Sequence, residues 1–175
     1  MNLPGLERAG GLLLILFGSR VWAKWRTARR ERTALTTPLF DAVLLETVFV
    51  PRPQDGDDPD LLAEMRDTFR HLNRRAYAEE FWGLHTQLVA LYEKLAEPQC
   101  ATMRRALLRL LLVNDRWLQL VAAKACADLK MPEAVPLLRA LLEPDTSPPA
   151  DAADVRYRQE LEQALATLTA PDANR

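Results

Sequence analysis

Apolar residues recur every three or four positions along most of this chain, a spacing that predicts helices rather than strands. Pro38 stands at a predicted first helical position after Thr37, and Asp60, Asn114 and Asp115 are predicted caps. Proline-containing loops are predicted at 51–59 and 145–152. The predicted helices cover 38–48, 60–72, 74–95, 98–113, 114–129, 134–143 and 154–168.

An internal repeat is superimposed on this pattern. The segment 105–108 (RALL) recurs at 139–142, an offset of 34 residues, and the same offset places 95–98 on 129–132. A period in this range is typical of stacked helical hairpins. The sequence therefore predicts an all-α protein, a short right-handed stack of helical hairpins. Its predicted parts are an N-terminal helical extension (1–50), a linker (51–59), a repeat body (60–170) and a frayed tail (171–175).

The segment 114–144 resembles a HEAT-like repeat of the short type found in bilin-lyase-like proteins. The resemblance rests on an Ala-rich first helix at 121–125, a Pro-Glu-Ala-Val-Pro turn at 132–136 and a Leu-rich second helix at 137–142, and it extends over about 75–170. The first unit departs from the pattern, because Arg104 stands where Leu138 stands in the next unit and Leu88 replaces the small Ala122. A tetratricopeptide repeat is the alternative, although its glycine and tyrosine positions are not matched.

Charge is distributed unevenly, although the formal net charge is only -1. A basic arm lies within residues 1–34, and Asp55, Asp57, Asp58 and Asp60 follow in and beside the predicted linker. A basic arm can meet lipid, nucleic acid or an acidic protein. The predicted contact residues of the arm are Arg20, Lys24, Arg26, Arg29, Arg30 and Arg32.

The uncharged run 9–19 precedes the arginines of this arm. It is shorter than the roughly 20 apolar residues that a membrane-spanning helix needs, so we expect it to cover one end of the repeat stack. Contact with a membrane surface is the alternative. Two cysteines, Cys100 and Cys126, are too few for a disulfide framework and suggest a reducing compartment. The predicted location is cytoplasmic, with a peripheral position at the inner face of a membrane as the alternative.

Candidate chemistry is sparse. The two histidines, His71 and His85, have no partners at metal-binding spacing, and no phosphate loop or nucleophile elbow occurs. Some HEAT-like relatives hold di-iron through His-Glu pairs, which this chain lacks, so we expect no metal and no cofactor. Other relatives act on linear tetrapyrroles or damaged DNA, and such an enzyme would need a pocket at Trp82 or Trp117 with Glu79, Glu80 or Asp115. We expect Trp82, Trp117 and Tyr157 to belong to the core instead.

Arginines on the second helix of each unit are the best candidate for a binding surface. Arg105 and Arg139 occupy equivalent repeat positions, and a predicted arginine ridge comprises Arg104, Arg105, Arg109 and Arg139. Arginine donates bidentate hydrogen bonds to carboxylates, which favours a protein partner with an acidic surface; local pairing, for example with Glu143, is the simpler alternative. The predicted function is a non-enzymatic adaptor or scaffold. A membrane-tethered helper protein is the alternative, and nucleic acid ranks last among the partners.

Overall fold

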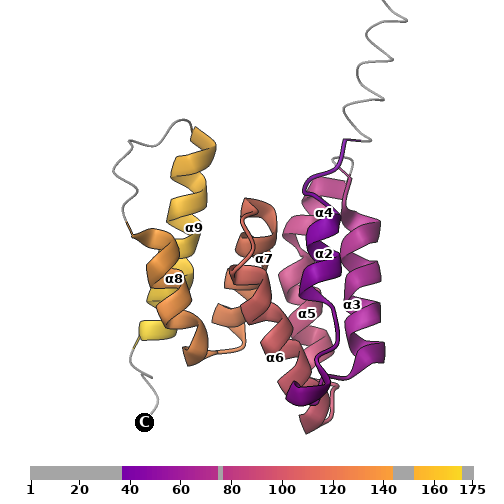
Figure 1. The fold of residues 1–175 in the computed structure, drawn as a ribbon. Helices are drawn as coiled ribbons and strands as arrows, with labels where there is room; N and C mark the ends of the chain where they lie inside the picture. The colour runs from indigo at the N-terminus through magenta and orange to yellow at the C-terminus, as the bar shows by residue number, and fades with distance from the viewer. Residues whose placement is uncertain (1–36, 75–76, 144–151, 171–175) are drawn as a thin grey trace, which may run out of the picture. The chain divides into compact units, whose positions relative to one another are not determined.

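The structure is a computed structural model that describes residues 37–74, 77–143 and 152–170. The chain divides into two units, Met1–Thr37 and Pro38–Arg175, and all the helices of the described residues belong to the second. All regular elements of the described residues are helical, which confirms the predicted all-α class (Figure 1). They are α2 (Val43–Val48), η1 (Pro53–Asp55), α3 (Pro59–Leu72), α4 (Ala78–Trp82), α5 (Leu84–Tyr92), α6 (Glu97–Leu111), α7 (Arg116–Asp128), η3 (Pro132–Ala134), α8 (Val135–Leu142) and α9 (Ala152–Thr169).

The helices pack in two sets around a common core. In one set α6 lies between α3 and α8, and in the other α7 lies between α5 and α9 (Figure 1). Successive helices form the pairs α6–α7 and α8–α9. Arg116 pairs with Asp154 near the start of both helices, and Lys124 pairs with Glu160 farther along both. Helices α7 and α9 therefore run in the same direction.

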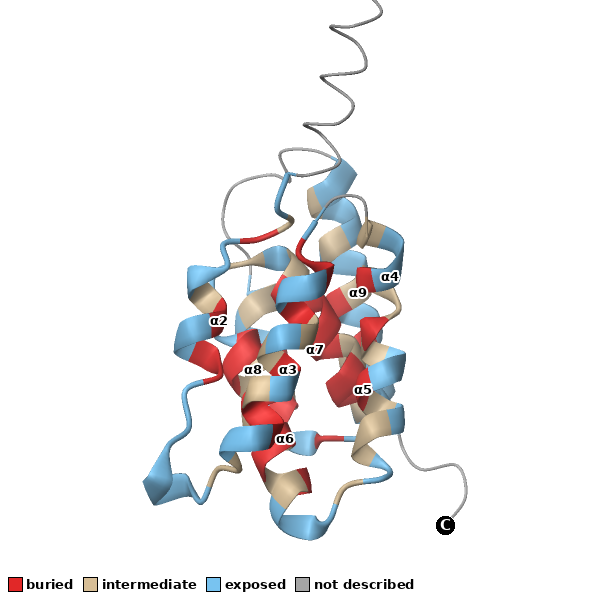
Figure 2. Cartoon of the chain, turned by 90° about the vertical axis from the view of Figure 1, so that its right-hand side faces the viewer, coloured by how far each residue is buried: buried red, intermediate tan, exposed pale blue. Residues whose placement is uncertain are grey.

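Helix α7 is the most buried element, as predicted from its small residues. Its side chains from Leu118 to Ala123 and from Ala125 to Ala127 are all buried, and Figure 2 shows buried residues along it. Asp115 caps its N-terminus as expected, accepting hydrogen bonds from the amides of Trp117 (2.9 Å) and Leu118 (3.1 Å). At the other end Lys130 adopts a left-handed conformation with φ 50°, and its amide bonds to the carbonyl of Ala127.

The start of the described chain differs from the prediction. A helix beginning at Pro38 was expected, but α2 begins at Val43. The reason is a distant side chain: Asn73 accepts hydrogen bonds from the amides of Leu39 (2.8 Å) and Phe40 (3.1 Å) and donates to the carbonyl of Phe40 (3.0 Å). The last of these bonds occupies the Phe40 carbonyl, which would accept the Leu44 amide in a helix begun at Pro38, and Leu44 donates to the Asp41 carbonyl instead.

Two further helix boundaries are corrected. The cap of α3 is Asp58 rather than Asp60, because the Asp58 carboxylate accepts from the amides of Asp60 and Leu61. The single helix predicted over 74–95 is divided into α4 and α5 at Gly83, a residue with low helix propensity. The helices predicted at 98–113, 114–129, 134–143 and 154–168 correspond to α6, α7, α8 and α9 within a few residues.

The boundary between extension and body was predicted at the linker 51–59. The structure divides the chain into units between Thr37 and Pro38. The side chains of Phe40, Leu45, Val48 and Phe49 are buried in the same core as α3 and α6. Residues 38–59 are therefore part of the packed body. The apolar run 9–19, the basic arm and the tail 171–175 lie outside the described residues.

Candidate interaction surface

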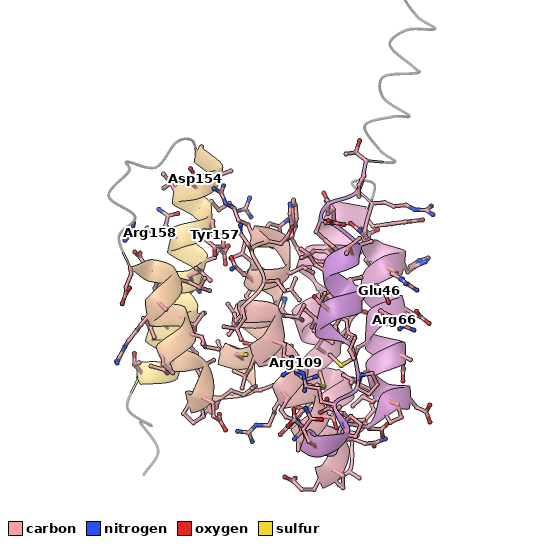
Figure 3. The ribbon with its side chains drawn as sticks, in the orientation of Figure 1. Glu46, Arg66, Arg109, Asp154, Tyr157 and Arg158 are labelled. Atoms are coloured by element: carbon pink, nitrogen blue, oxygen red, sulfur yellow. The ribbon has the colours of Figure 1, made fainter. Side chains whose placement is uncertain are left out.

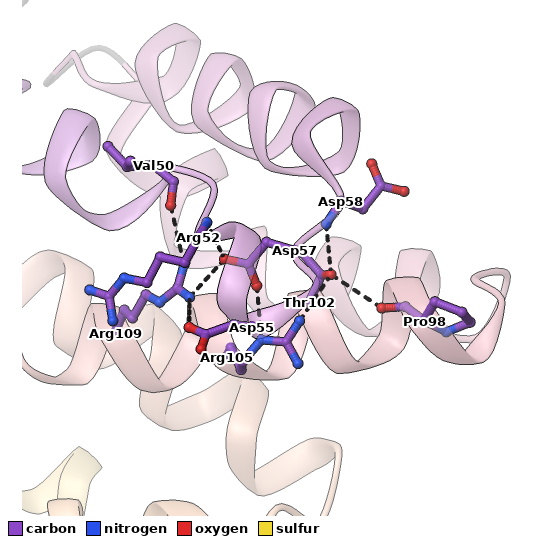
Figure 4. A network of polar contacts seen from close by, with 9 residues as sticks. All are labelled: Val50, Arg52, Asp55, Asp57, Asp58, Pro98, Thr102, Arg105 and Arg109. Carbon is purple, nitrogen blue, oxygen red and sulfur yellow. Dashed lines mark hydrogen bonds and ion pairs between the residues drawn. The ribbon is translucent and has the colours of Figure 1, made fainter.

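The predicted arginine ridge lies on α6, and most of it is covered by the chain itself. An acidic segment, residues 50–58, crosses α6 (Figure 4). Asp57 bonds to Arg105 Nε at 2.8 Å and to Arg109 Nη2 at 2.7 Å, while Asp55 lies 3.1 Å from Arg109 Nη2. The Asp57 side chain is 0% exposed and that of Arg109 only 10%. These two arginines are therefore engaged within the molecule.

The hydrogen bonds around Asp57 account for its ionisation. Burial of the carboxylate raises its pKa, but hydrogen bonds from Arg109, Arg105 and the Arg52 amide lower it by more, so the pKa lies below the ordinary value. Thr102 extends the network, because its hydroxyl accepts from the Asp58 amide at 3.0 Å. The network is one device that fixes residues 50–58 on α6.

The other two ridge residues do not extend this surface. Arg104 pairs with Glu133 from the turn before α8, and Arg139 on α8 is exposed. The four arginines therefore do not form one open ridge. Asp55 and Asp57 bind Arg105 and Arg109 within the molecule, and the binding of a partner by these arginines stays a prediction. The pairing is also not local, since Asp57 lies 48 residues before Arg105. The predicted contacts of the basic arm lie outside the described residues.

A groove runs along α9 on the face that carries Arg156 and Glu160, and most of its described lining comes from α9 itself. Its larger part is a hollow of about 470 Å³ lined on α9 by Ala152, Val155, Arg156, Gln159, Glu160 and Gln163. A smaller hollow of about 80 Å³ shares Glu160 and Gln163 with it and is also lined by His85 of α5 and by Lys124 and Asp128 of α7. We call the two hollows together the α9 groove.

A cation stacked on a tryptophan marks the end of this groove near the start of α9. The Arg156 guanidinium lies 5.3 Å from the Trp82 ring centre, and Lys124 Nζ lies 5.7 Å from the same ring. Lys124 also pairs with Glu160 at 2.9 Å. Arg156 is exposed and has no ion pair with a carboxylate among the described residues. The stacking holds this guanidinium in position while leaving its hydrogen-bond donors open.

The other end of the groove carries an acid. Asp128 at the end of α7 is 48% exposed, and its Oδ2 lies 3.7 Å from His85 Nε2. His85 Nδ1 lies 2.8 Å from the carbonyl oxygen of Trp82, which fixes the ring on α5. Within the described ranges, no group of histidine, cysteine or acidic residues has the arrangement of a metal site.

Helix α9, one wall of the groove, is attached to α7 by polar contacts as well as by apolar packing. The Tyr157 hydroxyl donates to Gln119 Oε1, and Gln119 Nε2 donates to the carbonyl of Val113 at 2.7 Å. Figure 3 labels Tyr157 and Asp154 on α9, and Asp154 pairs with Arg116 of α7. Burial raises the pKa of Tyr157 to about 12.

The aromatic residues expected in the core take part in it. Trp117 packs edge-on against Phe81, with ring centres 5.9 Å apart, and lies 5.0 Å from Trp82. Asp115, named for a pocket enzyme, caps α7 instead, and burial raises its pKa despite the two amide hydrogen bonds. Both cysteines are buried, and burial raises the pKa of Cys126 to about 12.

Residues of the α9 groove were not predicted as a site. Arg156 and Glu160 are four residues apart on one helical face, but that spacing is common on exposed helices. Their meeting with Trp82 and Lys124 depends on how α4, α7 and α9 pack, which the spacing does not reveal.

Two more observations bear on function. Among the described helices, none is long and apolar enough to cross a membrane. Comparisons of the chain with family models, with curated proteins and with solved structures found no match.

Proposed function

We propose that this protein is a non-enzymatic adaptor or scaffold that binds a segment of a partner protein in the α9 groove. The observation that carries the proposal is Arg156, an exposed guanidinium held on the face of Trp82 beside a hollow of about 470 Å³. A positioned arginine with open donors recognises a carboxylate through two parallel hydrogen bonds. The predicted acidic partner is therefore retained, with Arg156 replacing the arginine ridge as its contact.

The proposed architecture is a short HEAT-like stack of helical hairpins. The pairs α6–α7 and α8–α9, with α7 between α5 and α9 and α6 between α3 and α8, support it. Stacks of this kind bind other macromolecules along surfaces built from successive units. The α9 groove fits such a surface, because its residues come from the corresponding helices α5, α7 and α9. We place the protein in the cytoplasm, as its cysteine usage suggests.

A peptide-display selection on the full chain tests the proposal. Binders selected from a randomised library are measured against the wild type, Arg156→Glu and a control, Arg139→Glu, which reverses an exposed arginine of α8 outside the groove. We expect Arg156→Glu to weaken binding about tenfold or more, whereas the control leaves it within about twofold. Thermal unfolding checks that both variants are folded.

The proposal is overturned if no peptides are enriched, or if every enriched peptide binds Arg156→Glu as tightly as the wild type. A second groove variant, Val155→Glu, tests the same site through its apolar contact, since Val155 is 42% exposed and lines the larger hollow. Loss of binding in both groove variants supports the proposal.

A further inference from the structure

The charges of the α9 groove are arranged in order along it. Arg156 is the open cation near the start of α9, Lys124 and Glu160 are paired in the middle, and Asp128 is the exposed acid at the far end. Because the middle pair neutralises itself, the groove presents one positive end and one negative end. A ligand of one charge throughout would meet a like charge at one end.

The distance between these ends follows from the helix geometry. Asp128 lines the smaller hollow together with Ala164 of α9, and Ala164 is eight residues after Arg156. At about 1.5 Å of rise per residue, the two ends are about 12 Å apart along the helix axis. Two turns of another helix span the same distance, so residues seven or eight apart on one helical face reach both ends.

The described surface favours a helix over a peptide that binds by adding a strand. Strand addition pairs the peptide backbone with an exposed strand edge, and the described residues contain no strand. A helix brings its own backbone hydrogen bonds and needs only side-chain contacts. The exposed Val155, which lines the larger hollow, provides an apolar contact for such a helix beside the charges.

We infer that the ligand of the α9 groove is an amphipathic helix of a partner protein that carries an acidic and a basic residue seven or eight positions apart. The acidic residue pairs with Arg156, and the basic residue pairs with Asp128. This inference rests on the proposed function and specifies the partner's chemistry.

A charge-exchange experiment tests the inference. The probes are three amphipathic helical peptides of one sequence, differing only in two positions seven residues apart on the apolar face: Glu and Lys, Lys and Lys, or Glu and Glu. Binding is measured by fluorescence anisotropy to the wild type, Arg156→Glu, Asp128→Lys and the control Arg139→Glu. The wild type and the control should bind the Glu and Lys peptide about tenfold more tightly than the other two.

Each of the two groove variants should bind a different peptide most tightly. Arg156→Glu makes both ends acidic and should prefer the Lys and Lys peptide, whereas Asp128→Lys makes both ends basic and should prefer the Glu and Glu peptide. The inference is overturned if the wild type binds the three peptides equally or if no preference changes. Display binders that depend on Arg156 but lack the charge pair would also overturn it, while leaving the proposed function intact. Binders whose affinity is unchanged by the groove variants Arg156→Glu and Val155→Glu would overturn both the inference and the proposed function.

Discussion

Replacement of Asp57 by alanine should destabilise the protein by about 3 kcal/mol, because breaking a buried ion pair leaves a charge without its partner, at a typical cost of about 3–5 kcal/mol. The carboxylate is fully buried and contacts Arg105, Arg109 and the Arg52 amide. We take the lower end of the range for two reasons. Arg105 is 31% exposed and can be hydrated, and Asp55 remains 3.1 Å from Arg109.

Urea unfolding followed by circular dichroism measures this loss. With a slope of about 2 kcal/mol per molar urea, the midpoint should fall by about 1.5 M. Asp55→Ala is the matched control, since the Asp55 side chain is 34% exposed and its loss should cost about 1 kcal/mol or less. A loss below about 1 kcal/mol for Asp57→Ala, or equal losses for both variants, would refute the view that Asp57 is the centre of the network.

A double replacement examines the same reasoning. Asp57→Leu combined with Arg109→Met removes both charges, and it should lower the stability by less than the sum of the two single replacements, because no uncompensated buried charge remains at these two positions.

Unfolding at acidic pH provides a second test of the role of Asp57. The pKa of Asp57 is lowered from 3.8 in the folded state, so its stabilising effect is complete above about pH 4 and is lost as the pH falls below that value. The stability difference between the wild type and Asp57→Ala should therefore narrow in acid.

Three other predictions concern the core. The pKa of Tyr157 is raised from 10.0 to about 12, so the stabilising effect of the neutral phenol should be lost as the pH rises from about 10 to 12. Tyr157→Phe should remove this pH dependence in alkaline unfolding experiments. The same variant should lose about 1 kcal/mol of stability at neutral pH, because its hydrogen bond to Gln119 is absent. Cys126, with a pKa of about 12 and no exposed surface, should react with a thiol reagent only after unfolding, and reaction at equal rates in native and unfolded protein would contradict its burial. Ala122→Leu should destabilise by about 2 kcal/mol in urea unfolding because Ala122 is fully buried, whereas Ala140→Leu, at an exposed position of α8, should change stability little.

Local signals in the sequence predicted the helices of the second half well. Asp115 caps α7, and Pro136 stands in the first turn of α8, so both helix starts depend on residues within the helix or next to it. The small residues around Ala122 correctly indicated the most buried helix. The start of α2 was predicted wrongly because a distant residue is involved. Asn73 binds the backbone at Leu39 and Phe40, and no pattern near Pro38 contains that information.

Contacts between distant residues also explain why the candidate site was not predicted from the two clusters of charge. Acidic residues at 55–60 and arginines at 104–109 were both evident in the sequence, and their opposite signs were the available signal that they meet. Periodicity placed the arginines on one helical face, but it did not reveal that Asp57 covers Arg109. The α9 groove depends even more on packing, because Trp82, Lys124 and Arg156 belong to three different helices. Neither their spacing nor their composition distinguishes them from ordinary surface residues.

The charge network also bears on the order in which the chain folds. Its contacts join residues 48 to 54 positions apart, whereas α6–α7 and α8–α9 are pairs of consecutive helices. Closing a long loop costs more conformational entropy than joining neighbours, so the hairpins of the second half should form before residues 50–58 reach α6. Contacts made after the main barrier slow unfolding without accelerating folding. The ion pairs of Asp57 would then form after the folding transition state, and their loss would appear almost entirely as a faster unfolding rate.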